Sequence, residues 1–181
     1  DICRPWVLDE LARIAPVMAV SGDHDQLGAL PIPRSRIVTI GNIRIGVIHG
    51  RRWYPLDIAV VIAHVVARRR IAWRAGLHRW LTRQFPGVDC IVYGHWHQPD
   101  ITQVGSTLIF SPGAVCPWGS LQDGRPVRSG TRGFADRFVR RYRVQLGPEA
   151  MRPSVGIIDV SDDGVVARVI PYQVRTIDDL G

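Results

Sequence analysis

The sequence predicts an α/β protein in which β-sheets pack between helices. Three observations support this fold class: short apolar runs of strand length, segments of helical periodicity between them, and paired alternating segments around turn residues typical of hairpins. The 181 residues show no internal repeat and no second domain. A chain of this length buries roughly 70% of its unfolded surface, which is enough for one core without disulfides. We therefore expect a single domain over residues 1–181.

The first half of the chain predicts a helix, a strand and a hairpin. Pro5 suits the first turn of a helix, which we expect to end before Pro16. The apolar run 17–20, followed by a Ser-Gly pair, predicts a buried strand. Residues 36–40 and 43–48 alternate around a Gly-Asn pair and predict a hairpin.

The second half predicts helical structure, one more buried strand and two more hairpins. Apolar residues recur at helical spacing over 55–85, and we interpret about 51–85 as a helical insertion. The apolar run 90–93 predicts a buried strand. The hairpins are expected at 101–104 with 107–110 and at 155–160 with 165–170.

Arginine dominates the charge of the chain. All 23 basic residues are arginines, against 16 acidic residues, and the net charge is +7. The guanidinium fork matches phosphate geometry, so one interpretation is a phosphate-bearing partner; the alternative is coding bias or adaptation to heat. Segment 119–152 is especially rich in arginine. We interpret it as an insertion that forms a surface loop or helix near the site rather than part of the core.

The composition excludes two classes of protein. A hydrophobic content of 46% excludes a disordered chain. The longest nearly apolar run, 58–67, has about half of the ~20 residues that a membrane-spanning helix needs, so we expect no membrane partner. Cys3, Cys90 and Cys116 lack the spacing of a metal site and predict reduced thiols in a cytoplasmic protein.

Histidines mark the ends of the predicted strands. Four of the six stand where a strand gives way to a loop: His24, His49, His95 and His97. The carboxyl ends of strands are where α/β sheets bind ligands, and neutral imidazole suits zinc, manganese, iron and nickel. Asp23 adds a carboxylate beside the first of them. The alternative for any one histidine is a hydrogen-bonded structural residue.

These motifs, in this order, resemble the calcineurin-type metallophosphoesterases. The residues that carry the resemblance are Ser21-Gly22-Asp23-His24-Asp25, Leu30-Pro31, His49-Gly50, Gly94-His95-Trp96-His97-Gln98-Pro99 and Ser111-Pro112-Gly113-Ala114. Their spacing is similar to that of the small bacterial and archaeal phosphodiesterase branch, which is related to the retromer subunit of the same fold. The resemblance implies an α/β/β/α sandwich of two packed sheets flanked by helices, lacking its first strand and helix.

The resemblance also implies a site for two divalent metal ions. Asp1 matches the aspartate of the family's Gly-Asp motif, which bridges both ions. Asp23, His49 and His95 match ligands of one ion. His97 matches a ligand of the other ion. Manganese is the implied metal, with zinc, iron or nickel as alternatives.

The sequence departs from the family pattern in several places. The Asp-x-His motif, which supplies two ligands, is absent from the 181 residues; we expect it upstream in a longer sequence, and expect the chain as printed to be inactive or very weak. Asp23 stands at a position where the family has asparagine, and Arg51 replaces the second histidine of a His-Gly-His motif. Ser111 and Ala114 replace the Asn and Ser of the last motif.

The implied function is a metal-dependent phosphoesterase, and by resemblance alone a phosphodiesterase, in which a metal-bound hydroxide attacks phosphorus. The partner is then a small molecule carrying a phosphate ester. His24 matches a residue that protonates the leaving group in some relatives. Arg51 is a candidate for binding the phosphate; the alternative is a solvated loop residue.

Two other functions stay open at this point. One is a non-catalytic protein-interaction scaffold of the same fold. The other is nucleic-acid binding through segment 119–152, where Phe134, Phe138 and Tyr142 recur every four residues. The same aromatic stripe would equally suit packing on the domain. A homo-oligomer is compatible with the sequence.

Overall fold

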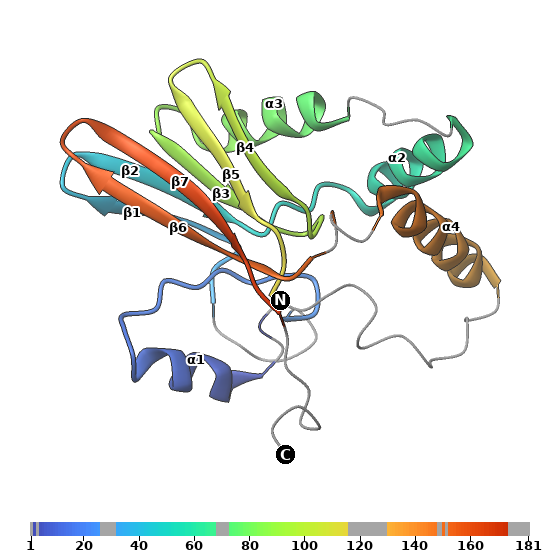
Figure 1. Ribbon diagram of the computed structural model, residues 1–181, viewed down its shortest axis with the longest axis horizontal. Helices are drawn as coiled ribbons and strands as arrows, with labels where there is room; N and C mark the ends of the chain where they lie inside the picture. Colours follow the sequence, from blue (N-terminus) through green and yellow to red (C-terminus); the bar gives the residue numbers. More distant parts are fainter. Residues whose placement is uncertain are drawn as a thin grey trace.

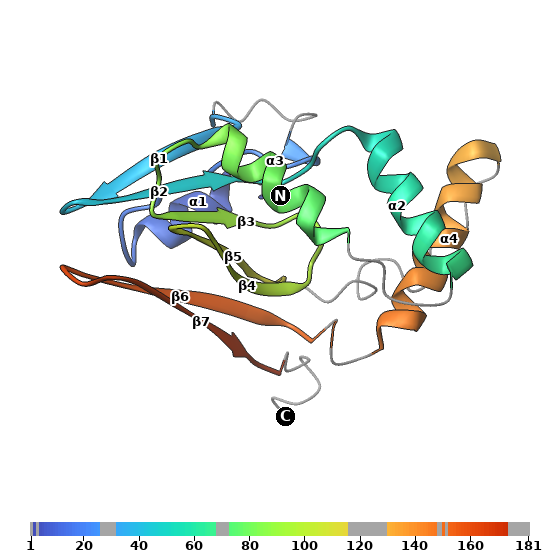
Figure 2. The same ribbon diagram turned by 90° about the horizontal axis from the view of Figure 1, so that it is seen from above.

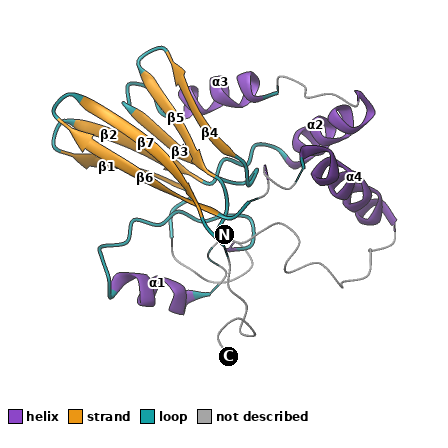
Figure 3. Ribbon diagram, in the orientation of Figure 1, coloured by secondary structure: helices purple, strands orange, loops and turns teal. Residues whose placement is uncertain are grey.

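The computed structural model describes residues 2, 4–25, 32–67, 73–115, 130–147, 150 and 152–173. They form two stacked β-sheets with four helices (Figures 1 and 3). The helices are α1 (Pro5–Ala12), α2 (Tyr54–Ala67), α3 (Arg74–Gln84) and α4 (Gly130–Leu146). The strands are β1 (Ser35–Ile40), β2 (Ile43–Ile48), β3 (Cys90–Tyr93), β4 (Pro99–Val104), β5 (Thr107–Pro112), β6 (Ser154–Ser161) and β7 (Gly164–Pro171).

The larger sheet has five strands in the order β1-β2-β3-β5-β4. The three central strands, β2, β3 and β5, are parallel to one another. The edge strands are antiparallel to their neighbours: β1 pairs with β2, and β4 pairs with β5. Helix α3 lies on one face of this sheet, and the β6–β7 hairpin covers the other face (Figure 2). The predicted class, two packed sheets with flanking helices, is confirmed, and all three predicted hairpins form.

The space between the two sheets is filled by apolar side chains of alternating strand positions. Ile43, Ile45, Cys90 and Phe110 form its buried centre, against partly buried residues of β6 and β7. Gly156 of β6 makes this approach achievable, since a Cβ there would lie 2.5 Å from Cζ of the Phe110 ring. The Phe110 ring therefore packs directly against the backbone of β6, and any residue larger than glycine at position 156 would displace it.

A second core lies on the other face of the five-stranded sheet. It joins α2, α3 and α4 to β3 and β5, and Leu77, Leu81 and Ile91 are among its fully buried members. Helices α2 and α4 pack side by side at one end of the molecule (Figures 1 and 2). Within the described residues, no helix has the length and apolar character needed to cross a bilayer.

Helix α4 corrects our expectation for the Arg-rich segment. The described part of that segment is helical, and its Tyr142 is 1% exposed in the second core, with Phe138 packed against it. The expectation that the segment contributes nothing to the core is therefore wrong. The aromatic stripe packs on the domain because one face of the helix is apolar while the arginines occupy the others. Phe134 lies in the part of α4 whose side chains fall outside the described residues.

The predicted strand over residues 17–20 is also wrong. These residues are extended coil, and Met18 is 56% exposed. Within the described residues this segment has no ladder partner; Ser21 instead donates its N–H to the carbonyl of Pro33, at 2.8 Å. An apolar run becomes a strand only where a neighbouring strand satisfies its backbone groups.

Candidate metal centre

Two parallel strands bring the candidate histidines to one edge of the sheet. His49 directly follows β2, and His95 follows β3 by two residues. Ile48 and Tyr93, the last residues of these strands, are register partners. The Gly94 N–H donates to the His49 carbonyl at 3.0 Å, so the two loops remain joined after the strands end. The carboxyl ends of parallel strands therefore place both imidazoles together, as sequence analysis predicts.

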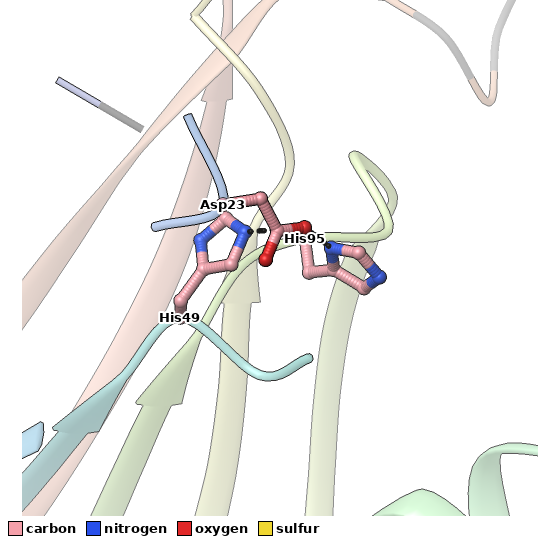
Figure 4. Close-up of side chains that lie close together, drawn as sticks. All are labelled: Asp23, His49 and His95. Atoms are coloured by element: carbon pink, nitrogen blue, oxygen red, sulfur yellow. Dashed lines mark ion pairs between the residues drawn. The ribbon is translucent and has the colours of Figure 1, made fainter. Parts of the chain in front are cut away.

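Asp23 completes a three-residue cluster between these imidazoles (Figure 4). Its Oδ2 lies 3.2 Å from Nδ1 of His95 and 3.7 Å from Nε2 of His49. One donor atom from each of the three residues lies within 4.8 Å of the other two. Three residues predicted to share one metal ion thus converge from three separate segments between residues 23 and 95.

Two of the three groups in the cluster have pKa values shifted in the direction that suits a divalent cation, and the third, His95, does not: burial lowers its pKa, but its contacts with Asp23 and Asp57 outweigh burial and raise it. Burial raises the pKa of Asp23, but its contacts with His49 and His95 and the hydrogen bond from Arg51 outweigh burial and hold that pKa well below its ordinary value. Burial lowers the pKa of His49, which favours the neutral imidazole that binds metals. One carboxylate and two imidazoles form a donor set that fits zinc, manganese, iron or nickel.

The Gly-His-x-His loop has an unusual backbone. Among the described residues, His95 and His97 are the non-glycine residues with positive φ, at 67° and 55°. Such left-handed conformations are uncommon and cluster at functional sites, where the surrounding structure holds them. Trp96 between them is 5% exposed and packs in the second core against Trp73, with ring centroids 4.2 Å apart. The buried indole anchors the loop.

A buried polar network supports the same loop from below. Asp100 accepts hydrogen bonds from Tyr93 Oη at 2.6 Å and Thr102 Oγ1 at 2.7 Å, and lies 2.6 Å from His78 Nε2. Arg74 Nη1 is 3.3 Å from its other oxygen. Burial raises the pKa of Asp100, but these hydrogen bonds and the Arg74 charge outweigh it and lower the pKa to about 2.

Helix α4 contributes to this support. Gln98, the residue after His97, donates to the buried Tyr142 hydroxyl at 2.8 Å and accepts from Arg74 Nη2 at 3.1 Å. His64 of α2 is buried with its ring edge-on to Tyr142 at 4.8 Å. Helix α4 of the Arg-rich segment therefore packs against residues that support the Gly-His-x-His loop.

The predicted ligands of the other ion are His97 and Asp1. His97 is half-buried and lies outside the three-residue cluster found among the described residues. Burial, followed by the positive charges of His95 and Arg143, lowers its pKa to about 3. Asp1 lies outside the described residues.

Asp25 has a structural role that sequence analysis missed. It is 3% exposed and accepts hydrogen bonds from the backbone N–H groups of Gly22, at 2.8 Å, and Ile2, at 2.8 and 3.0 Å. The carboxylate closes the turn that carries Asp23 and ties the start of the described chain to it. His24 stands in this turn with its side chain exposed. An acidic residue two positions after a candidate ligand, in a Gly-containing turn, is the signal that could have revealed this role.

Arg51 makes a contact that neither sequence interpretation anticipated. Its Nη1 lies 2.8 Å from Oδ1 of Asp23, and its guanidinium lies 5.5 Å from the Tyr54 ring centroid. The two departures from the family pattern therefore form an ion pair. Arg51 binds one carboxylate oxygen of Asp23 and leaves the other facing the histidines.

Asp57 and Arg52 were also missed. Asp57, in the first turn of α2, has Oδ2 3.4 Å from Nε2 of His95, and Arg52 binds its Oδ1. The available signal was an aspartate among the apolar residues of the predicted helix. Because an unpaired buried charge is costly, such a carboxylate indicates a charged or hydrogen-bonding partner nearby.

A cavity of about 610 Å³ opens beside the cluster. Asp23 and His49 contribute to its wall, together with Arg34 and Arg51. Three aromatic side chains also line it: Trp53, Tyr54 and Trp80. The cavity therefore joins the candidate metal ligands to a positively charged surface of the kind that binds phosphate groups.

Comparison with known families identifies the chain. Residues 1–127 match the model of the calcineurin-like phosphoesterase superfamily domain. The chain belongs to this family. Two curated relatives of this metallophosphoesterase domain are named probable metallophosphoesterases: one from Methanothermobacter thermautotrophicus, 30% identical over 63% of the chain, and one from Methanocaldococcus jannaschii, 32% identical over 67%. The alignments cover 56% and 55% of those proteins, so the chain spans about half the length of the relatives it matches.

Solved structures support the metallophosphoesterase fold. Vps29 from Cryptosporidium parvum matches with a TM-score of 0.52 and 19% identity, over 96% of this chain and 78% of that one. Vps29 from Entamoeba histolytica, solved in complex with Zn²⁺, matches with a TM-score of 0.51 and 17% identity, over 95% and 78%. At these identities the likeness concerns the fold alone.

Proposed function

We propose that the protein is a metal-dependent phosphodiesterase. The observation that carries this proposal is the convergence of Asp23, His49 and His95 beside a cavity whose wall includes Asp23, His49 and three arginines. Membership of the metallophosphoesterase family supports it, and the resemblance described above assigns these three residues as ligands of one ion. The diester specificity rests on the resemblance described above.

Different residues of the proposed site would bind the metal ions and the phosphate group. Asp23, His49 and His95 would hold one divalent ion, while Asp1 and His97 would serve a second ion in a dinuclear centre. Bound ions supply polarisation of the phosphoryl oxygens and a lowered pKa of bound water. The arginines of the cavity wall orient the phosphate by charge and by their forked geometry. Manganese remains the proposed metal, with zinc, iron and nickel as alternatives.

Chelation should test the metal requirement directly. Protein made from its complete coding sequence and stripped by chelator should lose hydrolysis of bis(p-nitrophenyl) phosphate, and Mn²⁺, Zn²⁺, Fe²⁺ or Ni²⁺ should restore it. The diester should be hydrolysed faster than p-nitrophenyl phosphate. Unchanged turnover after chelation, or no turnover with any of the four ions, contradicts the proposal. The second outcome would favour a non-catalytic scaffold of the same fold.

His24 should act on poor leaving groups more than on good ones. An alkoxide is a poor leaving group because the pKa of its alcohol is far above neutral, so it must be protonated as it departs. A nitrophenolate, whose phenol has a pKa near neutral, departs with little need of a proton. General acid catalysis contributes typically 10²–10⁴-fold, so His24→Ala should lower kcat/KM by about that factor on alkyl diesters and little on nitrophenyl diesters. The measurement is kcat/KM on both ester types. Equal losses on the two types would show that His24 only orients its neighbours or the substrate.

A cytoplasmic location also remains our proposal. Cys90 is a free thiol, buried between the two sheets. Burial, with a smaller effect of the Asp89 charge, raises its pKa to about 11, so this thiol stays protonated and unreactive at neutral pH. The other two cysteines lie outside the described residues.

A further inference from the structure

Asp57 is a buried carboxylate whose two oxygens face different partners. Its Oδ1 accepts hydrogen bonds from Arg52, at 3.2 Å from Nε and 3.0 Å from Nη2. Its Oδ2 has no hydrogen-bond partner within the part of the chain that the structure describes, and lies 3.4 Å from Nε2 of His95. Asp57 is 5% exposed. A buried carboxylate oxygen is costly without a donor, so the geometry calls for a proton on His95 Nε2.

The other ring nitrogen of His95 faces the candidate metal centre. Its Nδ1 lies 3.2 Å from Oδ2 of Asp23, so the imidazole stands between an inner and an outer carboxylate. A neutral imidazole carries one N–H and one lone pair. In the neutral imidazole that binds a metal ion, a proton on Nε2 leaves the lone pair on Nδ1, the nitrogen that faces Asp23.

We propose that Asp57, held by Arg52, is a positioning residue for His95. It accepts the Nε2 proton and thereby directs the Nδ1 lone pair towards the metal ion. The inference rests on the proposed function and assigns Asp57 no contact with substrate. Carboxylates that bind the outer N–H of a ligating histidine fix its tautomer and orientation, and their loss typically lowers metal affinity 10–100-fold.

The consecutive residues Arg51 and Arg52 serve both sides of this arrangement. Arg51 binds Asp23 and Arg52 binds Asp57, so each arginine occupies one oxygen and leaves the other facing His95. The Arg52–Asp57 pair is well buried, with side chains 10% and 7% exposed. If the Arg52–Asp57 pair had only a structural role, substitutions of Asp57 that leave the protein folded would not change the metal affinity of the site. If Asp57 positions His95, they would lower it.

The test uses two substitutions of Asp57 and one matched control. Asp57→Ala removes the acceptor. Asp57→Asn keeps the volume, and with its amide oxygen on Arg52 it presents an NH₂ to His95 Nε2, which favours the wrong tautomer. Asp159→Asn is the control, because Asp159 also pairs with an arginine, Arg168 at 2.9 Å, but lies on the exposed surface.

The primary readout is the Zn²⁺ dissociation constant, measured by competition with a chromophoric chelator on protein made from its complete coding sequence. Both Asp57 variants should bind Zn²⁺ about 10–100-fold more weakly than wild type, and Asp159→Asn should bind it equally. A second readout is the ¹⁵N NMR spectrum of histidines in Zn²⁺-loaded protein. Wild type should show a slowly exchanging proton on His95 Nε2, which should exchange faster in Asp57→Ala.

The possible results separate this inference from the proposed function. Wild type that binds none of Mn²⁺, Zn²⁺, Fe²⁺ and Ni²⁺ overturns both; if it binds another of these ions but not Zn²⁺, the same comparison is made with that ion. Wild type that binds Zn²⁺, with a folded Asp57→Asn variant of unchanged affinity, overturns only the positioning role. If Asp57→Ala does not fold, the affinity of Asp57→Asn and the NMR spectrum of wild type decide. A Zn²⁺-loaded wild type with the proton on Nδ1 of His95 also overturns the inference.

Discussion

His95→Ala should weaken metal binding more than any substitution of a residue outside the three-residue cluster in the described part of the site. The change removes the imidazole that lies between Asp23 and Asp57, and with it one of three converging donor atoms. Loss of a direct ligand should exceed the 10–100-fold effect of an outer-shell residue, so we expect a Zn²⁺ affinity lowered more than about 100-fold. Competition with a chromophoric chelator measures it.

Activity on two ester types should show whether His95→Ala impairs metal binding or proton donation to the leaving group. Because metal polarisation serves attack on any ester, His95→Ala should lower kcat/KM on alkyl and nitrophenyl diesters alike. His24→Ala is the contrast, since it should keep the Zn²⁺ affinity of wild type. Undiminished Zn²⁺ binding by folded His95→Ala protein would place the metal elsewhere and disprove the candidate centre.

Asp100→Ala should cause the largest loss of stability. The substitution removes the acceptor shared by Tyr93 and Thr102, and leaves buried His78 and partly exposed Arg74 without their carboxylate. Breaking a buried ionic network by removing one member typically costs about 3–5 kcal/mol in the free energy of unfolding. Urea unfolding at pH 7 measures the change. Asp159→Ala, which removes an exposed ion pair, should cost at most about 1 kcal/mol.

The contribution of Asp100 to the free energy of unfolding should depend on pH in the acid range. The pKa of Asp100 is lowered from its ordinary value of 3.8 to about 2 in the folded protein, so its stabilising effect is present above pH 4 and is lost as pH falls towards 2. Over that range wild type should lose about 2 kcal/mol more than Asp100→Ala. Parallel acid profiles for the two proteins would show that Asp100 is not held ionised by its network.

The sequence was sufficient for the elements whose signals are local. The Gly-Asn pair between residues 36–40 and 43–48 predicts the β1–β2 hairpin, and Pro5 predicts the start of α1, because turn and cap residues act on their neighbours. The run 17–20 has equally local strand character, yet it is coil. Its state depends on a ladder partner, which no pattern within the run reports.

The sequence by itself also determined which of the described residues form the candidate metal centre. The rule that parallel strands end at one edge places His49 and His95 together, whereas Asp23 follows from motif order alone, because the segment before it is coil. The same reasoning also named His24 and His97, which lie outside the cluster. Only the tertiary structure decided how they are held: that Arg51 pairs with Asp23, that Asp57 faces His95, and that α4 packs into the core through Tyr142. These contacts join distant segments, and their geometry depends on helix packing angles and side-chain directions that have no counterpart in sequence spacing.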